Sequence, residues 1–328
     1  LGQGISGRVA ATGEIINVPD AWELPYFDRS FDERNNFRTR SVLCQPIRGR
    51  FGKTIGVVQV INKQGKDRFE EEDETFLKGL VSQVGIALEN SLLVDEMKLS
   101  FEASIKTLSA TVDSRHPMTA GHSERVTEYA QMIAKVMKLG KEEQEAIKYA
   151  AILHDIGKIG IRDEILLKEG RFTPEHWEEM KTHPRKTKTI LEQFHFPRHL
   201  RNVPEIACRH HERIDGTGYT DGLTGDQIPL GAKIIAVADV FDALTSKRDY
   251  PKYTPEDTLD AAPIPLSEVI ELMKSQAGSH FDLRVMNAFL NCLPEALLRH
   301  RGDHFPTAYV DDVLKTLQTP SQPAAASH

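Results

Sequence analysis

The sequence predicts an α+β domain with an antiparallel sheet at the N-terminus, followed by an all-α domain. Residues 1–65 hold short, glycine-punctuated apolar stretches that are typical of strands. From Glu70 onward, apolar residues recur with the spacing of a helix. After Pro117 the helical pattern continues almost to Leu317, and the loops between the helical stretches hold most of the glycine, proline and histidine.

Bulk composition narrows the class of protein. A chain of 328 residues is longer than one compact core usually holds, so two domains are expected. The formal net charge of -7 disfavours a protein that binds DNA, RNA or an anionic membrane, because such proteins are normally basic. No apolar run reaches the roughly 18 residues of a membrane-spanning helix, and no signal peptide is visible.

The cysteines and the first residues add two expectations. Cys44, Cys208 and Cys292 are far apart and form no paired motif, so neither a disulfide scaffold nor a thiolate zinc site is indicated. A reducing, cytoplasmic location is therefore expected. The opening stretch LGQGISGRVAATGE is typical of the middle of a domain, so we expect that sequence upstream of it has been removed.

The strand prediction depends on a few apolar stretches. EIINVPD and RSVLCQPI carry short ones, and KTIGVVQVINK is the strongest because it is β-branched and ends in the turn-forming residues Asn-Lys-Gln-Gly. From about Glu71 to Ser114 we expect one long helix or two nearly collinear helices. Its apolar stripe contains Phe76, Leu80, Val84, Leu88, Met97, Phe101, Ile105, Leu108 and Val112.

This stripe has two interpretations. It could pack on the helix's own domain, as most amphipathic helices do. It could also form a parallel coiled coil that dimerises the protein and joins a sensor to an output domain. Because so long a stripe needs a partner, we predict the homodimer, with residues 91–114 as the linker helix.

Several histidines in the helical region lie beside carboxylates. His154 and Asp155 end the apolar run YAAILHD, and Asp239 ends the run KIIAVAD. A buried carboxylate beside an imidazole is costly unless a metal or a counter-charge compensates. The candidate ligands are His122, His154, Asp155, His183, His210, His211 and Asp239. A single histidine is usually an ordinary polar residue, but this combination predicts a metal site.

The ligand types narrow the metal. Imidazole and carboxylate without thiolate suit iron or manganese, with nickel or zinc as alternatives. Two divalent ions bridged by a carboxylate are a usual arrangement for phosphodiester cleavage. With two carboxylates and a bridging hydroxide, such a centre keeps a small positive charge that attracts a phosphodiester anion. A two-metal hydrolytic centre is therefore favoured.

The helical region resembles the HD-GYP family. The run HHERIDGTGYTDGLTGDQIPLGAKIIAVADVFDALTSKRDY is similar to the segment that defines the family. Upstream, TAGHSERV, AAILHDIGKIGI and EEMKTHP resemble its other motifs in the same order. The resemblance implies an all-α domain of the HD superfamily over residues 115–300. Residues 301–328 are expected to form a tail whose end is disordered.

The resemblance also implies a role for each candidate ligand. One metal would be held by His122, His154, Asp155 and Asp239. The second would be held by Asp155, His183, His210 and His211, with Asp155 as the bridge. A water or hydroxide between the metals would be the nucleophile. Glu212 is expected to support a ligand rather than to be one.

Further residues match substrate contacts of the family. Lys158 lies one helical turn after His154 and would contact the scissile phosphate. Arg248 would bind the second phosphate of the dinucleotide. Each could instead be an ordinary surface residue. The loop that names the family would contain Gly216, Gly218 and Tyr219, and it would approach the ligand or a partner such as a diguanylate cyclase domain.

Three positions depart from the family pattern. Thr220 replaces the proline of the name motif, which is expected to loosen the loop. Met118 occupies the position of a glutamate found in three-metal relatives, and a thioether is a poor ligand for a hard site, so two metals are expected. Pro251 occupies a usual basic position and Lys252 follows it, which leaves substrate affinity and preference open.

The N-terminal region resembles a partial GAF domain over residues 1–90. It includes Asn62, Lys63, Phe69, Asp73 and Glu74, which match the pattern of cyclic-nucleotide-binding GAF domains. In those domains the pattern supports the fold more than it touches the nucleotide. Phe69 could be a core residue, with the two acids favouring a helix N-terminus. The domain could bind a cyclic nucleotide, bind another small ligand, or only dimerise.

Three functions compete. The resemblance implies hydrolysis of cyclic di-GMP to the linear product pGpG, with GMP as a further product. Alternatively, the protein could be a low-turnover sensor or scaffold that binds the dinucleotide or partner signalling domains. A third possibility is an HD hydrolase for cyclic mononucleotides or guanosine polyphosphates. The complete ligand set and Lys158 favour the first, and the segment from His210 to Tyr250 disfavours the third.

Overall fold

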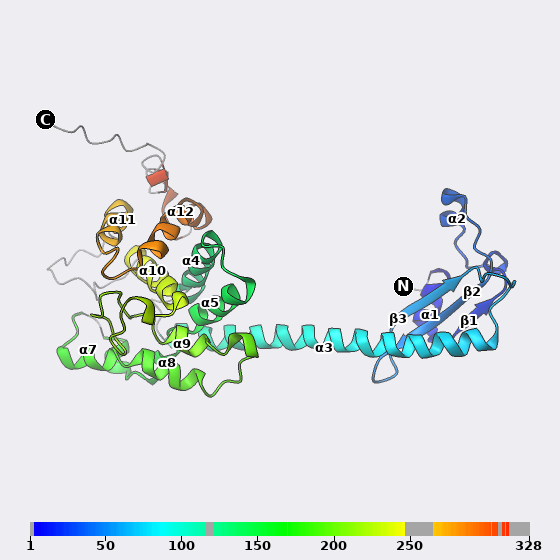
Figure 1. Ribbon diagram of the computed structural model, residues 1–328, viewed down its shortest axis with the longest axis horizontal. Coiled ribbons are helices and arrows are strands. Elements are labelled where there is room, and N and C mark those ends of the chain that lie inside the picture. The colour runs from blue at the N-terminus through cyan, green and yellow to red at the C-terminus, as the bar shows by residue number, and fades with distance from the viewer. Residues whose placement is uncertain are drawn as a thin grey trace. The chain divides into compact units, whose positions relative to one another are not determined.

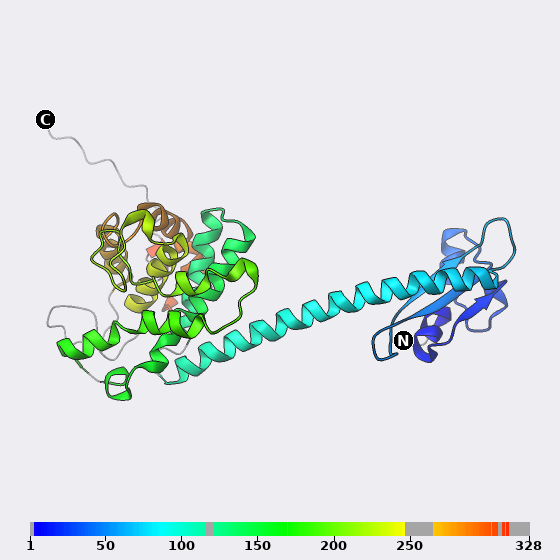
Figure 2. The same cartoon turned by 60° about the horizontal axis from the view of Figure 1, so that its bottom comes forward.

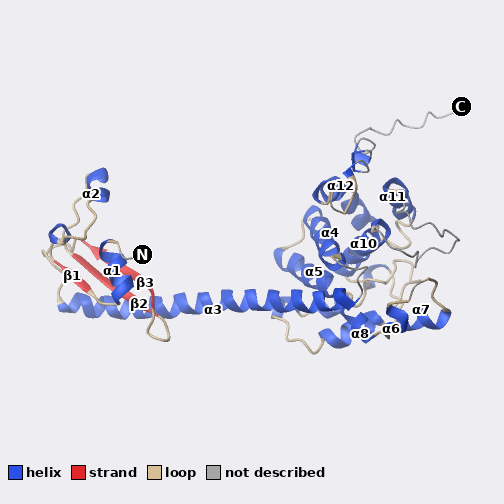
Figure 3. Cartoon of the chain, turned by 180° about the vertical axis from the view of Figure 1, so that it is seen from behind, coloured by secondary structure: helices blue, strands red, loops and turns tan. Residues whose placement is uncertain are grey.

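The computed structural model describes residues 3–115, 121–168, 170–246, 265–302, 304–307, 310–311 and 313–314. The chain divides into two compact units, Leu1–Glu102 and Ala103–His328. The first unit contains a three-stranded antiparallel sheet in the order β1-β2-β3. All of the described strands lie in this unit (Figure 3). Their bounds are Ile16–Val18, Val42–Arg48 and Thr54–Ile61.

The sheet of the first unit has an apolar core on each face. Side chains of a strand alternate between faces, so Val42 and Cys44 pack with Ile5 and Val9 of helix α1 (Gly4–Thr12). On the opposite face, residues of β2 pack with apolar residues of helix α3 (Glu71–Arg115), as the cluster of Leu43, Ile47, Leu77 and Val81 shows. Figure 1 shows α1 and α3 near this sheet. The remaining helices of the unit are η1 (Ala21–Glu23) and α2 (Ser30–Asn35).

Helix α3 is continuous over its whole length, which confirms the prediction of a long helix from about residue 71. Its apolar stripe divides into parts with different surroundings. Phe76 and Met97 are 70% and 72% exposed. Ile105 and Val112 are buried, at 1% and 7% exposure. The stripe therefore packs on its own chain at some positions and is open at others, and the predicted coiled-coil dimer stays a prediction.

The second unit is built from helices that bury apolar side chains between them. Helix α4 packs against α5, α10 and α12, and Figure 2 shows this group from a second direction. Tyr129 of α4 and Phe289 of α12 both contact Phe241 of α10 through edge-on ring contacts. The longer helices are α4 (His122–Val136), α5 (Lys141–Leu153), α8 (His183–Leu191), α10 (Leu230–Thr245), α11 (Leu266–Ser275) and α12 (Leu283–Arg299). The shorter ones are η3 (Ile156–Gly160), α6 (Asp163–Leu166), α7 (Pro174–Met180), η4 (Arg198–Leu200), α9 (Val203–Ala207) and η5 (Gly225–Gln227).

The predicted fold class is confirmed, with an antiparallel sheet first and helices after it. No helix in the described part of the chain is both long and apolar enough to cross a membrane. The predicted domain boundaries at residues 90, 114 and 300 stay predictions. Met118, Arg248, Pro251 and Lys252 lie outside the described residues, as does the predicted disordered end over residues 319–328.

Candidate metal centre

The seven predicted ligands come from the ends of four helices and from the middle of a fifth. His122 is the first residue of α4, and His183 is the first residue of α8. His154 follows the last residue of α5, and His210 and His211 follow α9 by a few residues. Asp239 lies within α10. Helix ends suit this task because they let a side chain leave the helix and point into the space between helices.

The structure brings these seven side chains together into overlapping groups. In each group, one ligand atom per residue lies within 4.8 Å of the others. His122, His154 and Asp239 form one group, and His183, His210 and His211 form another. A third group contains His154, Asp155 and His210 and joins the first two. The two outer groups contain the ligands that the family resemblance implied for each metal, apart from the bridging Asp155.

Three of the histidines share one local arrangement. The Nδ1 atom of each donates a hydrogen bond to the backbone carbonyl three residues earlier. The distances are 2.6 Å from His154 to Ala151, 2.8 Å from His183 to Met180 and 2.7 Å from His210 to Ala207. Because a carbonyl can only accept, Nδ1 must carry the proton, and Nε2 of the neutral ring keeps its lone pair. This is the tautomer that a metal ligand requires.

Those three Nε2 atoms are buried, and none has a hydrogen-bond partner among the described residues. The same holds for Oδ1 of Asp155. A buried polar atom without a partner costs about 1–3 kcal/mol, so four such atoms at one place would be strongly destabilising. Divalent cations would satisfy the lone pairs of all four. The donor set and its burial therefore fit a metal centre.

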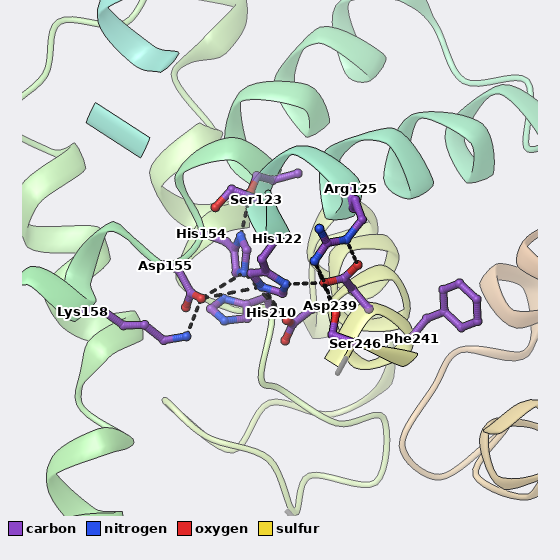
Figure 4. Close-up of polar contacts among 12 residues, drawn as sticks. His122, Ser123, Arg125, His154, Asp155, Lys158, His210, Asp239, Phe241 and Ser246 are labelled. Atoms are coloured by element: carbon purple, nitrogen blue, oxygen red, sulfur yellow. Dashed lines mark hydrogen bonds and ion pairs between the residues drawn. The ribbon is translucent and has the colours of Figure 1, made fainter. Parts of the chain in front are cut away.

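Asp155 lies at the middle of the centre. Its Oδ1 is 3.2 Å from Nε2 of His183, and its Oδ2 is 3.4 Å from Nε2 of His154. Nε2 of His122 is 3.8 Å from the same Oδ2. The Lys158 ammonium forms an ion pair with this carboxylate at 2.5 Å, and Figure 4 shows Lys158 pointing toward it. Burial opposes ionisation, but the Lys158 ammonium outweighs it, so the pKa of Asp155 is well below its usual range.

His122 differs from the other histidines because a carboxylate, rather than a carbonyl, orients it. Its Nδ1 donates to Oδ2 of Asp242 at 2.8 Å. Asp242 is fully buried and also accepts hydrogen bonds from Arg125 and Ser246. Sequence analysis did not single out Asp242. The available signal was its position three residues after Asp239, which places both carboxylates on one side of α10.

The pKa values of His122 and His210 are shifted in opposite directions. Burial lowers the pKa of His122, but hydrogen bonds with Asp239 and Asp242 outweigh it and raise the pKa to about 9. Burial lowers the pKa of His210 to about 3. His210 is therefore neutral at pH 7, as a ligand must be. A metal that binds His122 has to displace a proton, so its affinity falls with falling pH.

The loop predicted from Gly216 to Tyr219 packs against the chain's own backbone. A Cβ atom at Gly218 would lie 2.4 Å from the backbone nitrogen of Arg213, so only glycine fits there. This close approach is to the backbone of residues 211–213, and the predicted approach to a ligand or partner stays a prediction. The ring of Tyr219 stacks on that of His211, with 4.7 Å between the ring centroids. Tyr219 thus supports one face of a predicted ligand.

The expectation of a loosened loop at Thr220 is not supported. Its backbone nitrogen donates to Oε1 of Glu212 at 2.9 Å, and its Oγ1 donates to the carbonyl of Cys208 at 3.2 Å. A proline has neither donor, so threonine adds two hydrogen bonds that the family's usual residue cannot make. Glu212 is buried and also accepts from the backbone of Asp221 and Leu223. Its carboxylate therefore holds the loop.

The residues of the N-terminal motif interact mainly with each other and with their own fold. The side chain of Asn62 bonds the backbone of Arg38 and Arg40. Lys63 forms an ion pair with Asp73. Phe69 packs against the apolar cluster between the sheet and α3, and Glu74 accepts a hydrogen bond from Asn17 at 2.6 Å. All five motif residues have a structural role in this unit.

Fold and site together define a protein with a helical unit that carries a histidine- and aspartate-rich cluster able to hold metal ions. The chain belongs to the HD domain family, whose model matches residues 106–285. The model of the GAF domain matches residues 1–88. These matches lie over the second and the first compact unit, respectively, and confirm the two resemblances drawn from the motifs.

The curated relatives are phosphodiesterases of bacteria. The chain is 39% identical over 212 residues to the cyclic di-GMP phosphodiesterase response regulator RpfG of Xanthomonas campestris, covering 64% of this chain and 53% of the relative. It is 32% identical over 291 residues to the 3'3'-cGAMP-specific phosphodiesterase 2 of Vibrio cholerae, covering 86% and 53%. It is 40% identical over 186 residues to a cyclic di-GMP phosphodiesterase of Thermotoga maritima, covering 57% and 48%. The matches span about half the length of these relatives.

Proposed function

We propose that this protein is a metal-dependent phosphodiesterase that hydrolyses cyclic di-GMP to pGpG, with GMP as a further product. The observation that carries the proposal is the convergence of three buried, unpaired imidazole nitrogens on the Asp155 carboxylate. The buried lone pairs of these donors have no hydrogen-bond partner among the described residues, and bound cations would satisfy them. The relatives named above act on cyclic dinucleotides, which supports the choice of substrate class.

The ligand sets follow the spatial groups. His122, His154, Asp155 and Asp239 would hold one metal, and Asp155, His183, His210 and His211 the other. Bound divalent ions would supply the Lewis acidity and positive charge that phosphodiester cleavage requires. Iron or manganese suits the imidazole and carboxylate donors best, with nickel or zinc as alternatives.

The remaining residues of the centre orient the donors and bind substrate. Asp242 fixes the ring of His122 by accepting the Nδ1 hydrogen bond. Lys158 keeps part of its side chain exposed beside Asp155, at 20%, so its ammonium can reach a phosphate at the edge of the centre. In that position it would stabilise the charge that develops on the scissile phosphate. Tyr219 would hold the ring of His211 by stacking.

Three regulatory properties belong to the same proposal. The first unit would sense a small ligand, with a cyclic nucleotide as one candidate, and the second would be the output. The exposed part of the α3 stripe would join two chains in a parallel dimer. The loop with Gly216 and Tyr219 would offer a surface to a partner such as a diguanylate cyclase domain. The alternative, a low-turnover sensor, is weakened because Thr220 ties the loop down.

The test combines metal analysis with turnover on one preparation. Protein loaded anaerobically with iron or manganese should hold about two ions per chain and hydrolyse cyclic di-GMP. Parallel assays with 3'3'-cGAMP compare the substrates named for the relatives. An occupied centre that binds the dinucleotide without cleaving it would support the sensor. A centre that stays empty after loading would exclude the enzyme.

A further inference from the structure

The last turn of α3 contacts two parts of the metal centre within the second unit. Oδ1 of Asp113 accepts a hydrogen bond from Oγ of Ser123 at 3.1 Å, and Ser123 follows the predicted ligand His122. Arg115, the last residue of α3, reaches the 3-10 helix η3, which carries Lys158. The linker helix therefore ends directly on the segment that holds the proposed phosphate contact.

Arg115 binds the C-terminal carbonyls of η3. Its Nη1 atom donates to the carbonyls of Ile159 at 2.6 Å and Lys158 at 3.4 Å. Its Nη2 atom donates to the carbonyl of Ile161 at 3.2 Å and pairs with the Asp163 carboxylate. Carbonyls at a helix end have no partner within the helix, and a five-residue 3-10 helix makes few bonds of its own. The guanidinium thus holds the end of this short element together with Lys186, whose Nζ donates to the carbonyl of Gly160 at 2.6 Å.

The opposite side of η3 is held by α8. The backbone nitrogen of Gly157 donates to Oγ1 of Thr187 at 3.0 Å, and that hydroxyl donates to the carbonyl of His154 at 2.9 Å. A Cβ atom at residue 157 would lie 2.0 Å from the carbonyl oxygen of His183, so the two segments are in direct contact. Helix α8 thus holds one side of η3, and Arg115 adds the contacts to the carbonyls of Lys158, Ile159 and Ile161 from the end of α3.

We propose that Arg115 is a positioning residue for Lys158: it ties η3 to the end of the linker helix and thereby sets where the Lys158 ammonium lies relative to Asp155. This inference rests on the proposed function for its catalytic consequence. Arg115 itself contacts backbone and Asp163, so it acts through Lys158 and not on the substrate. Any rearrangement of the last turn of α3 would reach the phosphate contact by this route.

The placement of η3 can be tested without turnover. Hydrogen–deuterium exchange on the full chain should show faster exchange of the amides of residues 156–161 in Arg115→Ala, on the order of tenfold. Arg162→Ala is the matched control, because Arg162 pairs with Glu164 and Glu179 at the surface of the same unit. Arg115→Lys should restore part of the protection. Unchanged exchange in Arg115→Ala, or an equal change in the control, would overturn the proposal.

The catalytic consequence is tested by a double-mutant cycle with metal content checked in each variant. Arg115→Ala should lower kcat about tenfold in the unsubstituted background and less than about twofold in Lys158→Ala, since two residues that act as a unit are not additive. Equal losses in both backgrounds would mean that Arg115 acts independently of Lys158, which contradicts the proposal. If the loaded protein hydrolyses no cyclic dinucleotide, the proposed function fails, while the exchange experiment still decides how η3 is held.

Discussion

The two units of this protein use their polar motif residues in opposite ways. In the first unit, Asn62, Lys63, Asp73 and Glu74 all find hydrogen-bond or ion-pair partners within their own fold. In the second, the Nε2 atoms of three predicted ligands have no hydrogen-bond partner among the described residues, although they are buried. Motif residues that are fully paired support a fold. Motif residues with unpaired buried atoms point to a ligand.

This contrast predicts that the motif residues of the first unit contribute to stability and those of the second unit to ligand binding. Unpaired buried atoms cost free energy, and a protein retains such atoms when binding compensates for them. Paired residues contribute to the folded state whether or not a ligand is present. Substitutions in the second unit should therefore change metal content and hydrolysis strongly, whereas those in the first should change stability and leave the chemistry intact.

The largest effect is expected for Asp155→Ala. The carboxylate lies between His183, His154 and Lys158, and it is the proposed bridge. Without it at least one metal should be lost, and hydrolysis should fall to background. Elemental analysis and turnover of cyclic di-GMP measure the two quantities together. Full activity in this variant would show that the centre has been assigned to the wrong residues.

Lys158→Ala should have the next largest effect. It removes a charge that lies beside the centre and leaves the seven proposed ligands in place. We expect the metals to remain and kcat to fall by about 10²- to 10³-fold, as for the loss of one preorganised charge contact. Arg162→Ala serves as a control for loss of a surface cation. If Lys158→Ala lost its metals, the lysine would be needed for ligand binding instead.

Asp242→Asn tests the carboxylate behind His122. An amide can still accept from Nδ1, but it lacks the charge that holds Arg125 and raises the pKa of His122. Removal of such a supporting carboxylate typically lowers metal affinity or activity about 10- to 100-fold. Metal titration followed by turnover checks this. Unaltered affinity would mean that hydrogen bonding alone, without charge, is sufficient to orient the ring.

Much of this centre could be predicted from residue types and motif order. His154–Asp155 and His210–His211 are adjacent in sequence, and the recognised motifs supplied the intervals to His122, His183 and Asp239. Asp242 could not be assigned in the same way, because its role depends on how α10 meets α4. That contact is a property of tertiary packing. The three-residue spacing from Asp239 places Asp242 on the same side of α10 but does not show that His122 lies beside it.

Other features of the protein were predictable only where the pattern was local. The strand KTIGVVQVINK and the long helix were found because their periodicity is strong. The effect of Thr220 was misjudged because a proline-to-threonine change suggests flexibility until the acceptors are known. Those acceptors, Glu212 and the carbonyl of Cys208, lie 8 and 12 residues away along the chain. The role of Arg115 could likewise not be predicted, because its partners lie more than forty residues further along the chain.

Asn62→Ala tests the first unit, in which the motif residues are paired and are expected to support the fold. Asn62 adopts φ 54°, and its side chain makes two hydrogen bonds to backbone. Loss of both bonds and the strain of alanine in a left-handed conformation should destabilise the first unit by about 2 kcal/mol. Metal content and basal hydrolysis should not change. Asn62→Gly, which removes only the strain, should recover part of the loss. A fall in metal content would show that the motif serves the centre directly.

Leu108→Glu should have the smallest effect on basal chemistry, and it examines the helix shared by both units. Leu108 is 39% exposed, while Ile105 on the preceding turn is buried in its own unit. In a parallel dimer, glutamates at this position would face each other, and like charges would weaken the association. Sedimentation should therefore show dissociation of the dimer. A turnover assay should show unchanged basal hydrolysis and no response to a ligand of the first unit. Ala110→Glu adds the same charge at an exposed position outside the stripe and should leave the dimer intact. If an unsubstituted chain with a complete GAF domain sediments as a monomer at tens of micromolar, the dimer is contradicted.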